Sequence, residues 1–317
     1  MAVELSLRDF YGKTLVELGK KNPNVVVLDC DLSGSTRTSL FAKEFPARFF
    51  NMGVAEQDMI GTAAGLAAGG KIPFASTFAI FATGRGWEQI RQSVCYPQAN
   101  VKIVASHGGV TVGPDGPSHQ AGEDVAIMRA IPGMTVIVPA DAYDTAAAVR
   151  AAEEFTGPVY IRLTRDKFPV IYEESRKFEI GRATTMKNGS DVTFITCGLM
   201  THAALIAAEK LTQLGKSAAV LDMGTIKPLD EPAVLKAALE TGAIVTAEEH
   251  NIIGGLGGAV AEAVSGNVPV PVVRVGLPDQ YFSSGTPEEL LEAAGLTPEH
   301  LVEAAMRAIN LKRGGKA

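Results

Sequence analysis

Short runs of β-branched residues alternate along this chain with segments of helical period. The runs at 24–29 (NVVVLD) and 101–106 (VKIVAS) are almost entirely apolar, which is typical of strands buried on both faces. The segment at 55–68 (AEQDMIGTAAGLAA) has the composition and period of a helix. Strands and helices that alternate in this way predict a mainly parallel sheet with helices on both faces, so the expected fold class is α/β.

A polar stretch over about residues 166–190 interrupts this alternation. We predict a linker there and place a domain boundary near residue 187. Because a second α/β run follows, we expect two domains, 1–187 and 188–317, each a mainly parallel sheet flanked by helices. A chain of 317 residues is long enough for two such cores.

The composition excludes several classes of protein. The net charge is −6 and the lysines and arginines are scattered, so there is no basic surface for nucleic acid or an anionic membrane. Cys30, Cys95 and Cys197 form no CxxC pair, which argues against a disulfide framework or a zinc site and favours a reducing cytoplasm. The N-terminus does not have the pattern of a signal peptide, and no apolar run approaches the roughly 20 residues of a membrane span.

The loop at 106–124 (SHGGVTVGPDGPSHQAGED) is the segment most typical of a site. It contains five glycines and two prolines, and it carries His107, Asp115 and His119. Glycines let a backbone approach a ligand closely, and a loop after a parallel strand lies where open α/β sheets bind ligands. Each histidine alone could be incidental, but long loops in compact domains are usually functional. We therefore predict a binding site on this loop.

Each of the other candidate residues has two possible interpretations when it is considered alone. Glu56 lies in the first turn of its predicted helix, where an acid stabilises the helix by about 0.3–1 kcal/mol without any catalytic role. Phe78 and Phe81 have the i, i+3 spacing of one helix face, which suits either a core or a wall for a flat ring. The glycines at 254–259 (GGLGGA) match neither a dinucleotide fingerprint nor a P-loop, which favours close helix packing.

Taken together, these segments resemble the C-terminal half of a transketolase, a thiamine-diphosphate enzyme that moves two-carbon ketol units between sugar phosphates. The resemblance covers essentially the whole chain, as a pyrimidine-binding domain followed by the transketolase C-terminal domain. Its most specific segments are GVAEQDM, STFAIF and SHGGVTVGPDGPSHQAGED with IPGMTVIVPAD, and then TIKPLD and EEHNIIGGLGGAV.

The resemblance implies a cofactor site. Glu56 matches the catalytic glutamate that hydrogen-bonds N1′ of the cofactor's aminopyrimidine, a task that needs a carboxyl able to hold a proton near neutrality. Phe78 and Phe81 match the aromatic positions that pack on the pyrimidine ring. Some relatives have a third aromatic where this chain has Gly84, so Trp87 or the partner is expected to complete the pocket wall.

The resemblance also implies the substrate contacts. Asp115 and His119 match residues that contact the donor sugar near its C1 and C2 oxygens, and we assign His119 a catalytic role beside Glu56. Arg8, Ser35, His107 and Arg165 match the clamp for the sugar phosphate. Two guanidiniums, a hydroxyl and an imidazole can satisfy a dianionic phosphate with charge-assisted hydrogen bonds.

The chain contains no G-D-G motif, which in the family holds a divalent metal and the cofactor's diphosphate. The resemblance therefore implies a split enzyme. This chain would supply the pyrimidine and substrate side, with no metal ligand of its own. A separate N-terminal subunit would hold the diphosphate and Mg²⁺ or Ca²⁺. Since the family's cofactor lies at a dimer interface, we expect self-association through this subunit and an α2β2 heterotetramer that acts on sugar phosphates.

Three alternatives remain at this stage. Half of a deoxyxylulose-phosphate synthase shares the DGPSHQ-like loop but usually has an acid at the position of His107. The beta subunit of a 2-oxo-acid dehydrogenase has this length but does not usually carry that loop or the phosphate clamp. A non-catalytic scaffold subunit is disfavoured because Glu56, Asp115 and His119 are all retained.

Overall fold

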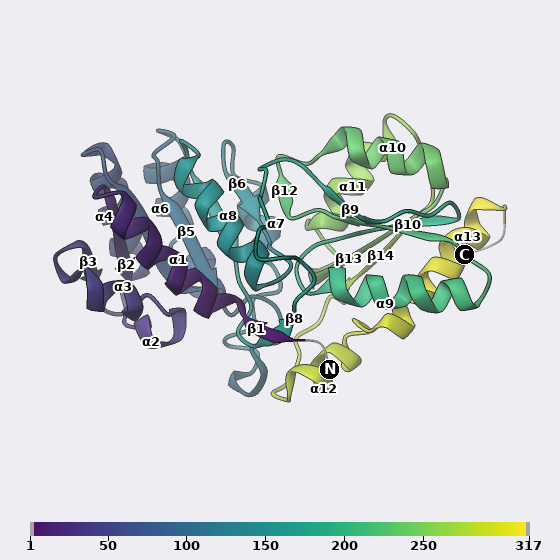
Figure 1. The fold of residues 1–317 in the computed structure, drawn as a ribbon, viewed down its shortest axis with the longest axis horizontal. Helices are drawn as coiled ribbons and strands as arrows, with labels where there is room; N and C mark the ends of the chain where they lie inside the picture. Colours follow the sequence, from purple (N-terminus) through teal and green to yellow (C-terminus); the bar gives the residue numbers. More distant parts are fainter. Residues whose placement is uncertain (1–2, 315–317) are drawn as a thin grey trace.

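The computed structural model describes residues 3–314. Its two larger sheets lie side by side along the long axis of the molecule, each flanked by helices (Figure 1). Both are mainly parallel, so the predicted α/β class is confirmed. Within the described residues, no helix combines the length and apolarity needed to cross a bilayer.

The first half of the chain builds a sheet of seven strands. Every neighbouring pair is parallel except the one at the edge, where a strand from the second half pairs antiparallel. The spatial order is β12 (Thr225–Lys227), β6 (Thr135–Ile137), β7 (Val159–Arg162), β5 (Lys102–Ser106), β4 (Ile72–Phe78), β2 (Val25–Asp29) and β3 (Phe49–Asn51).

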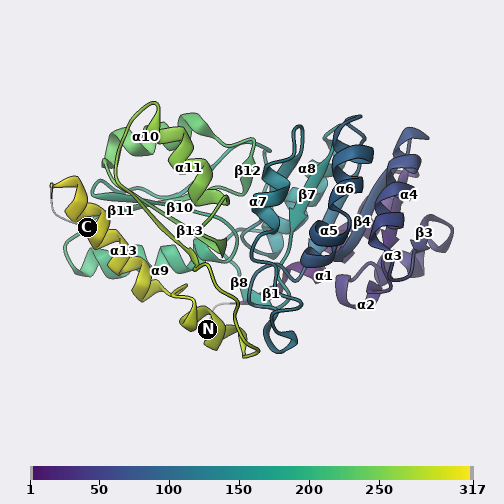
Figure 2. The same cartoon turned by 180° about the vertical axis from the view of Figure 1, so that it is seen from behind.

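Helices cover both faces of this sheet, which is why β2, β5 and β7 are buried along their whole length. One face carries α1 (Leu7–Lys21), α3 (Ser39–Glu44) and α8 (Ala142–Glu154). The other face, turned to the viewer in Figure 2, carries α4 (Glu56–Ala68), α5 (Ala79–Arg85), α6 (Trp87–Gln89), a π-helical turn (Ile90–Cys95) and α7 (Asp124–Arg129). The short α2 (Ser33–Thr36) lies in the connection after β2.

The second half builds a sheet of five strands in the order β14 (Val272–Leu277), β13 (Ile244–Asn251), β10 (Val192–Thr196), β11 (Ala218–Asp222) and β9 (Thr184–Lys187). The sheet is parallel except for β9. Its helices are α9 (Met200–Gln213), α10 (Glu231–Thr241), α11 (Leu256–Ser265), α12 (Pro287–Ala293) and α13 (Pro298–Lys312). In Figure 1, α10 and α11 lie on one side of the sheet, and α9 and α13 on the other.

The polar stretch predicted to be a linker contains two short strands. β8 (Lys167–Pro169) pairs antiparallel with β1 (Glu4–Ser6), and β9 joins the second sheet. Strands of three or four residues are too short to show a period in the sequence. Since β9 begins at Thr184, the second sheet starts a few residues before the boundary placed near 187, and the extents 1–187 and 188–317 stay a prediction.

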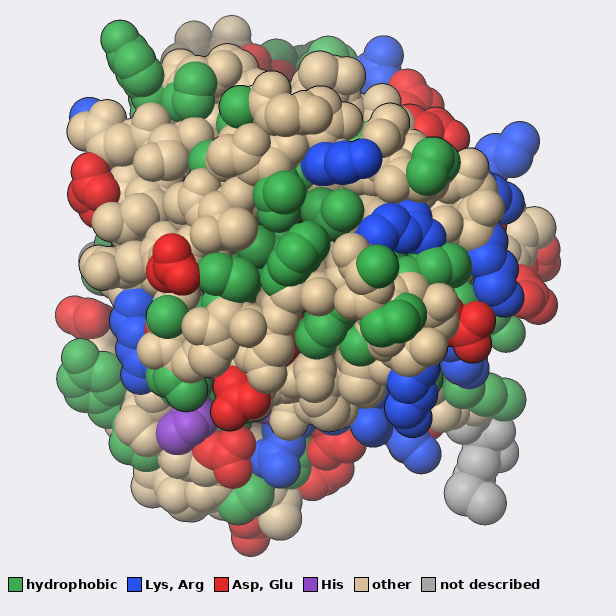
Figure 3. All heavy atoms as spheres, turned by 90° about the vertical axis from the view of Figure 1, so that its left-hand side faces the viewer, with side chains coloured by type: hydrophobic (Ala, Val, Ile, Leu, Met, Phe, Trp, Pro, Cys, Tyr) green, Lys and Arg blue, Asp and Glu red, His purple; other side chains and the backbone are tan. Residues whose placement is uncertain are grey.

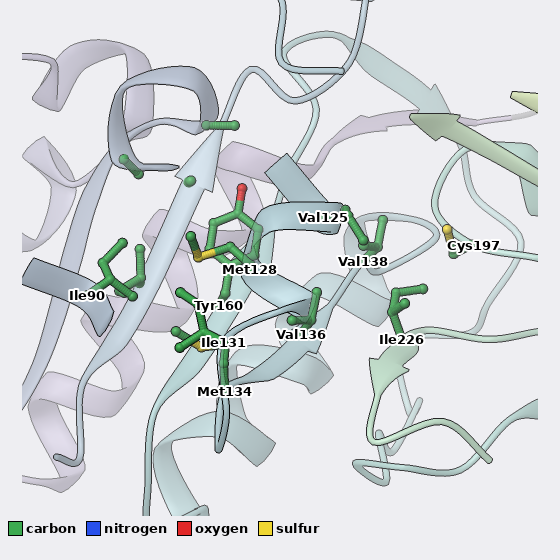
Figure 4. Packing of buried hydrophobic residues seen from close by; sticks show 14 of the residues in the cluster. Ile90, Val125, Met128, Ile131, Met134, Val136, Val138, Tyr160, Cys197 and Ile226 are labelled. Atoms are coloured by element: carbon green, nitrogen blue, oxygen red, sulfur yellow. The ribbon is translucent and has the colours of Figure 1, made fainter. Parts of the chain in front are cut away.

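One apolar core crosses from the first half into the second. Met128 and Tyr160 belong to the same buried cluster as Cys197 and Ile226, which come from the second half (Figure 4). These side chains are at most 5% exposed. The two halves of the chain therefore pack against each other through one shared apolar core.

Candidate functional site

The candidate residues lie after the carboxyl ends of neighbouring strands of the first sheet. Ser35 follows β2, Glu56 follows β3, Phe78 ends β4, His107 follows β5 and Arg165 follows β7. Ligands of open parallel sheets bind at this edge. Residues up to 130 positions apart in the sequence are thereby brought to one edge of the fold.

Glu56 is the first residue of α4, so it lies in the first turn of the helix that the sequence predicts over 55–68. Its side chain is 4% exposed, and Oε1 accepts a hydrogen bond of 3.0 Å from Nη1 of Arg85. A cavity of about 550 Å³ opens beside it and is also lined by Val54 and Gly84. A buried carboxylate at the mouth of a cavity is placed to exchange a proton with a ligand rather than with bulk water.

Phe78 and Phe81 stack on each other but do not share a helix. Phe78 is the last residue of β4, and Phe81 lies in the first turn of α5, so the expectation of one helix face is wrong. Their ring centroids are 5.7 Å apart and the planes differ by 17°. The junction between β4 and α5 thus places the two rings side by side as a flat apolar wall. The i, i+3 spacing had suggested such a wall on the assumption of a single helix.

Arg85 is a site residue that the sequence analysis missed. Its guanidinium lies 4.1 Å from the Phe81 ring centroid while it pairs with Glu56. Beside Gly84, Arg85 lines the cavity, whereas Trp87 is not among its described lining residues. The i, i+4 spacing of Phe81 and Arg85 was a usable signal, because residues four apart on a helix are neighbours.

The two histidines of the loop flank the aromatic pair. The ring of His107 stacks on Phe78 with centroids 3.6 Å apart, and the ring of His119 meets Phe81 edge-on at 5.3 Å. His107 is 2% exposed, and its φ of +62° lies in the left-handed region that a residue with a side chain rarely adopts. Such local strain is typical of functional sites, where the surrounding fold holds the residue in place.

The arginines of the expected clamp are fixed by backbone carbonyls. Nη1 of Arg8 donates to the carbonyl of Ser35 at 2.7 Å. Nη1 of Arg165 donates to the carbonyl of Val112 and lies 3.7 Å from Oδ1 of Asp115. The guanidiniums are thus held at defined positions of the loops that also carry the other candidates.

The turn that carries Ser35 is held by a buried carboxylate. Oδ1 of Asp29 accepts from the Leu32 amide at 2.6 Å, and Oδ2 accepts from the hydroxyls of Thr36 and Thr38 at 2.7 and 2.9 Å. Asp29 is fully buried at the end of β2. The sheet therefore fixes the position of Ser35 through its own strand end.

His107 lies in a positive field. Burial, and then the guanidiniums of Arg8 and Arg165, lower the pKa of His107 to about 3. These three groups all belong to the expected clamp. In such a clamp a neutral imidazole can donate a hydrogen bond to an anion, and the arginines can supply the positive charge.

We expect the His107 imidazole to remain neutral at about pH 5, well above its pKa of about 3, when no anion is bound. Inorganic phosphate should raise this pKa, because a bound dianion offsets the two guanidiniums. A histidine-selective NMR titration with and without phosphate measures both values, and the spectrum of His107→Gln assigns the signal. Titration near pH 6.5 without phosphate would contradict this account.

Two family models match the chain. The transketolase pyrimidine-binding domain matches residues 3–170, and the transketolase C-terminal domain matches residues 181–301. The two models follow each other in the order expected from the sequence and together cover most of the chain.

Relatives of similar length share much of the sequence. A putative transketolase C-terminal section from Methanocaldococcus jannaschii is 53% identical over 303 residues, covering 95% of each chain. The 6-deoxy-6-sulfo-D-fructose transketolase subunit of a Clostridium species is 46% identical, covering 94% of this chain and 93% of that one. Among solved structures, a split gene transketolase described as an inactive beta4 tetramer superposes with a TM-score of 0.92 at 55% identity, over 98% of this chain and all of that one.

Proposed function

Since the chain belongs to the transketolase family, we propose that it is one subunit of a split, thiamine-diphosphate-dependent transketolase. The reaction proposed is transfer of a two-carbon ketol unit from a ketose phosphate, such as xylulose 5-phosphate, to an aldose phosphate, such as ribose 5-phosphate. The observation that carries the proposal is the meeting of Glu56, the Phe78–Phe81 wall and the arginine-flanked His107 at one sheet edge.

The residues present fit the cofactor's aminopyrimidine. The Arg85 guanidinium is a flat cation that already stacks on Phe81 and hydrogen-bonds Glu56. A flat, nitrogen-bearing ring at the same position would stack on Phe81 and hydrogen-bond Glu56 in the same way. When bound, thiamine diphosphate supplies a thiazolium carbon that acts as the nucleophile, which no side chain of this chain can replace.

Each site residue then has a specific task. Glu56 would hold and move the proton at the ring nitrogen that it faces. Asp115 and His119 would hydrogen-bond the oxygens of the donor sugar near the reacting carbons. Arg8 and Arg165 would bind the distant phosphate, and that binding energy would orient the sugar for reaction.

We assign the diphosphate and its Mg²⁺ or Ca²⁺ to a separate N-terminal subunit. Within residues 3–314 there is no cluster of three or more His, Cys, Asp or Glu that could hold a metal ion. Val54, which lines the Glu56 cavity, is 74% exposed. Apolar side chains also gather in a band across the outer end of the first domain (Figure 3), a surface suited to another subunit.

The proposed assembly is an α2β2 heterotetramer in which this chain alone is inactive. The similar solved structure, an inactive beta4 tetramer of a split gene transketolase, supports self-association through this kind of subunit. Its inactive state also agrees with a cofactor site that needs a second polypeptide.

Reconstitution tests the proposal. The chain would be mixed with its partner subunit, thiamine diphosphate, Mg²⁺, xylulose 5-phosphate and ribose 5-phosphate, and sedoheptulose 7-phosphate would be measured. Product is expected from the pair and from neither subunit alone. Failure of a cofactor-loaded pair to turn over any sugar substrate, or turnover with pyruvate as the sole donor, would overturn the proposal.

A second donor deserves a parallel reaction. One relative is named for 6-deoxy-6-sulfo-D-fructose, a sugar whose sulfonate is also a terminal anion. The cluster of Arg8, Arg165 and neutral His107 is suited to either anion. Comparing kcat/KM for the sulfonated and phosphorylated ketoses identifies the preferred donor.

Arg85→Met should tighten binding of thiamine diphosphate to the assembled complex by about two- to tenfold, because the ring no longer has to displace the guanidinium from Glu56 and Phe81. The effect is small because the Arg85 side chain is 50% exposed. Isothermal titration calorimetry measures the Kd, and Arg182→Met, which removes an exposed arginine of the linker, is the control. Weaker binding by Arg85→Met would show that the guanidinium supports the cofactor instead.

A further inference from the structure

The loop that carries Asp115 and His119 is anchored to the second half of the chain on both sides of these residues. Before them, the Thr111 amide donates to Oε1 of Glu249 at 2.8 Å. After them, Nε2 of Gln120 donates to the carbonyl of Ser283 at 3.1 Å. These two bonds join residues 138 and 163 positions apart in the sequence, so they depend on how the two halves pack.

Further contacts extend this attachment. The side chain of Val110 is 1% exposed and belongs to the apolar core of the second half, together with Leu277 and Phe282. The amide of Asn251 donates to the carbonyl of Gly122 at 2.7 Å. The loop is therefore held by the second half near its beginning and near its end, on either side of Asp115 and His119.

Glu249 is the acidic residue of this attachment. Its side chain is 3% exposed, and a Cβ at Gly109 would collide with its carboxylate. Arg162, also buried, donates to the backbone carbonyls of Glu249 at 2.7 Å and of Ala121 at 3.2 Å. The arginine therefore links the strand that carries Glu249 to the far end of the same loop.

Arg162 also balances the buried charge. Its Nε forms an ion pair with Oδ2 of Asp124 at 3.0 Å, and that oxygen accepts a hydrogen bond of 2.7 Å from the hydroxyl of Tyr160. Buried acids persist where a cation and hydrogen bonds compensate them. The network connects β7, the start of α7 and β13, which are the elements that surround the loop.

The neighbouring acid, Glu248, is equally buried but has a different task. Successive side chains of a strand point to opposite faces, so Glu248 points away from the loop. Its carboxylate accepts from the amides of Leu256 and Gly257 at 2.7 and 2.8 Å and thereby caps α11. Glu248 thus stabilises the second half internally and makes no hydrogen bond to the loop in the described structure.

We propose that Glu249 is a positioning residue for the substrate: through the Thr111 amide it holds the loop so that Asp115 and His119 face the donor sugar. The second half of the chain then has a direct part in substrate recognition, beyond packing. This inference rests on the proposed function for its kinetic consequence, whereas the attachment of the loop can be tested without any turnover.

The test compares Glu249→Ala with Glu248→Ala in the reconstituted complex. Both variants remove a buried carboxylate from β13, so both should lower Tm. Glu249→Ala should raise KM for the phosphorylated donor and lower kcat/KM by about 10- to 100-fold, because a misplacement on the order of 1 Å costs that much. Glu248→Ala should leave KM unchanged, and Glu249→Gln, which keeps an acceptor for the Thr111 amide, should recover most of the loss.

Hydrogen exchange of the Thr111 amide gives a second readout. Exchange should accelerate in Glu249→Ala and stay slow in Glu248→Ala. Equal increases in KM in the two alanine variants, an unchanged KM in Glu249→Ala, or unchanged exchange at Thr111 would overturn the inference. If the unmodified complex turned over no sugar, the proposed function would fail, and accelerated exchange would still show that Glu249 holds the loop.

Discussion

Glu56→Gln should lower kcat by about 100- to 10,000-fold, the range expected when a general acid–base group is removed. The amide keeps the size of the side chain but cannot exchange a proton with a ring nitrogen. Glu56 is buried and lines its cavity, so its carboxyl is placed to act on a ligand that fills that cavity. Steady-state kinetics of the reconstituted complex measure kcat, and gel filtration checks that the assembly is intact.

Asp58→Asn is the matched control for this variant. Asp58 is the other acid in the first turn of α4, it is exposed, and it lines the same cavity. An acid there complements the helix dipole by about 0.3–1 kcal/mol whether or not it takes part in chemistry. Similar, small losses in both variants would mean that Glu56 is a helix-start acid and not the catalytic carboxyl.

The sequence predicts those parts of the fold that are determined by residues close together in the chain. Buried strands such as β2 and β5 show as apolar runs, and the start of α4 at Glu56 follows from composition and period. β8 and β9 escaped prediction because they are three and four residues long and exist through pairing with distant partners. The role of Phe78 was likewise set by the end of a strand, which the spacing to Phe81 does not reveal.

The residues of the candidate site likewise fall into those with a local signal in the sequence and those without one. The loop at 106–124 could be identified by its glycines and histidines, and the arginines only through a family resemblance. Arg85 had a local signal, its i, i+4 spacing from Phe81. The contact between Glu249 and Thr111 had none, because it joins residues 138 positions apart and depends on the packing of two halves. Long-range positioning of this kind requires the structure.

Replacing Arg165 with methionine should reduce kcat/KM for a phosphorylated ketose by about 10- to 100-fold, since a hydrogen bond to a charged group contributes about 1.5–3 kcal/mol. The loss should be much smaller for the same ketose without its phosphate, because that sugar has no anion to bind. Arg8→Met should behave in the same way. Both guanidiniums lower the pKa of His107, the imidazole that we assign to the same phosphate clamp.

Arg37→Met distinguishes direct binding of the phosphate from a general electrostatic effect of nearby positive charges. Arg37 lowers the pKa of Arg8 and so lies in the same positive field, but it pairs with Asp9 at 2.7 Å and is not assigned to the clamp. If the phosphate is held by direct hydrogen bonds, Arg37→Met should change kcat/KM by less than about threefold, as expected for a partly exposed charge. If the arginines act merely as a diffuse field, the three variants should lose similar amounts, and the losses should diminish as salt is added. Equal losses on phosphorylated and unphosphorylated donors would contradict the clamp altogether, since removing a phosphate-binding group should not weaken the reaction of a sugar that lacks the phosphate.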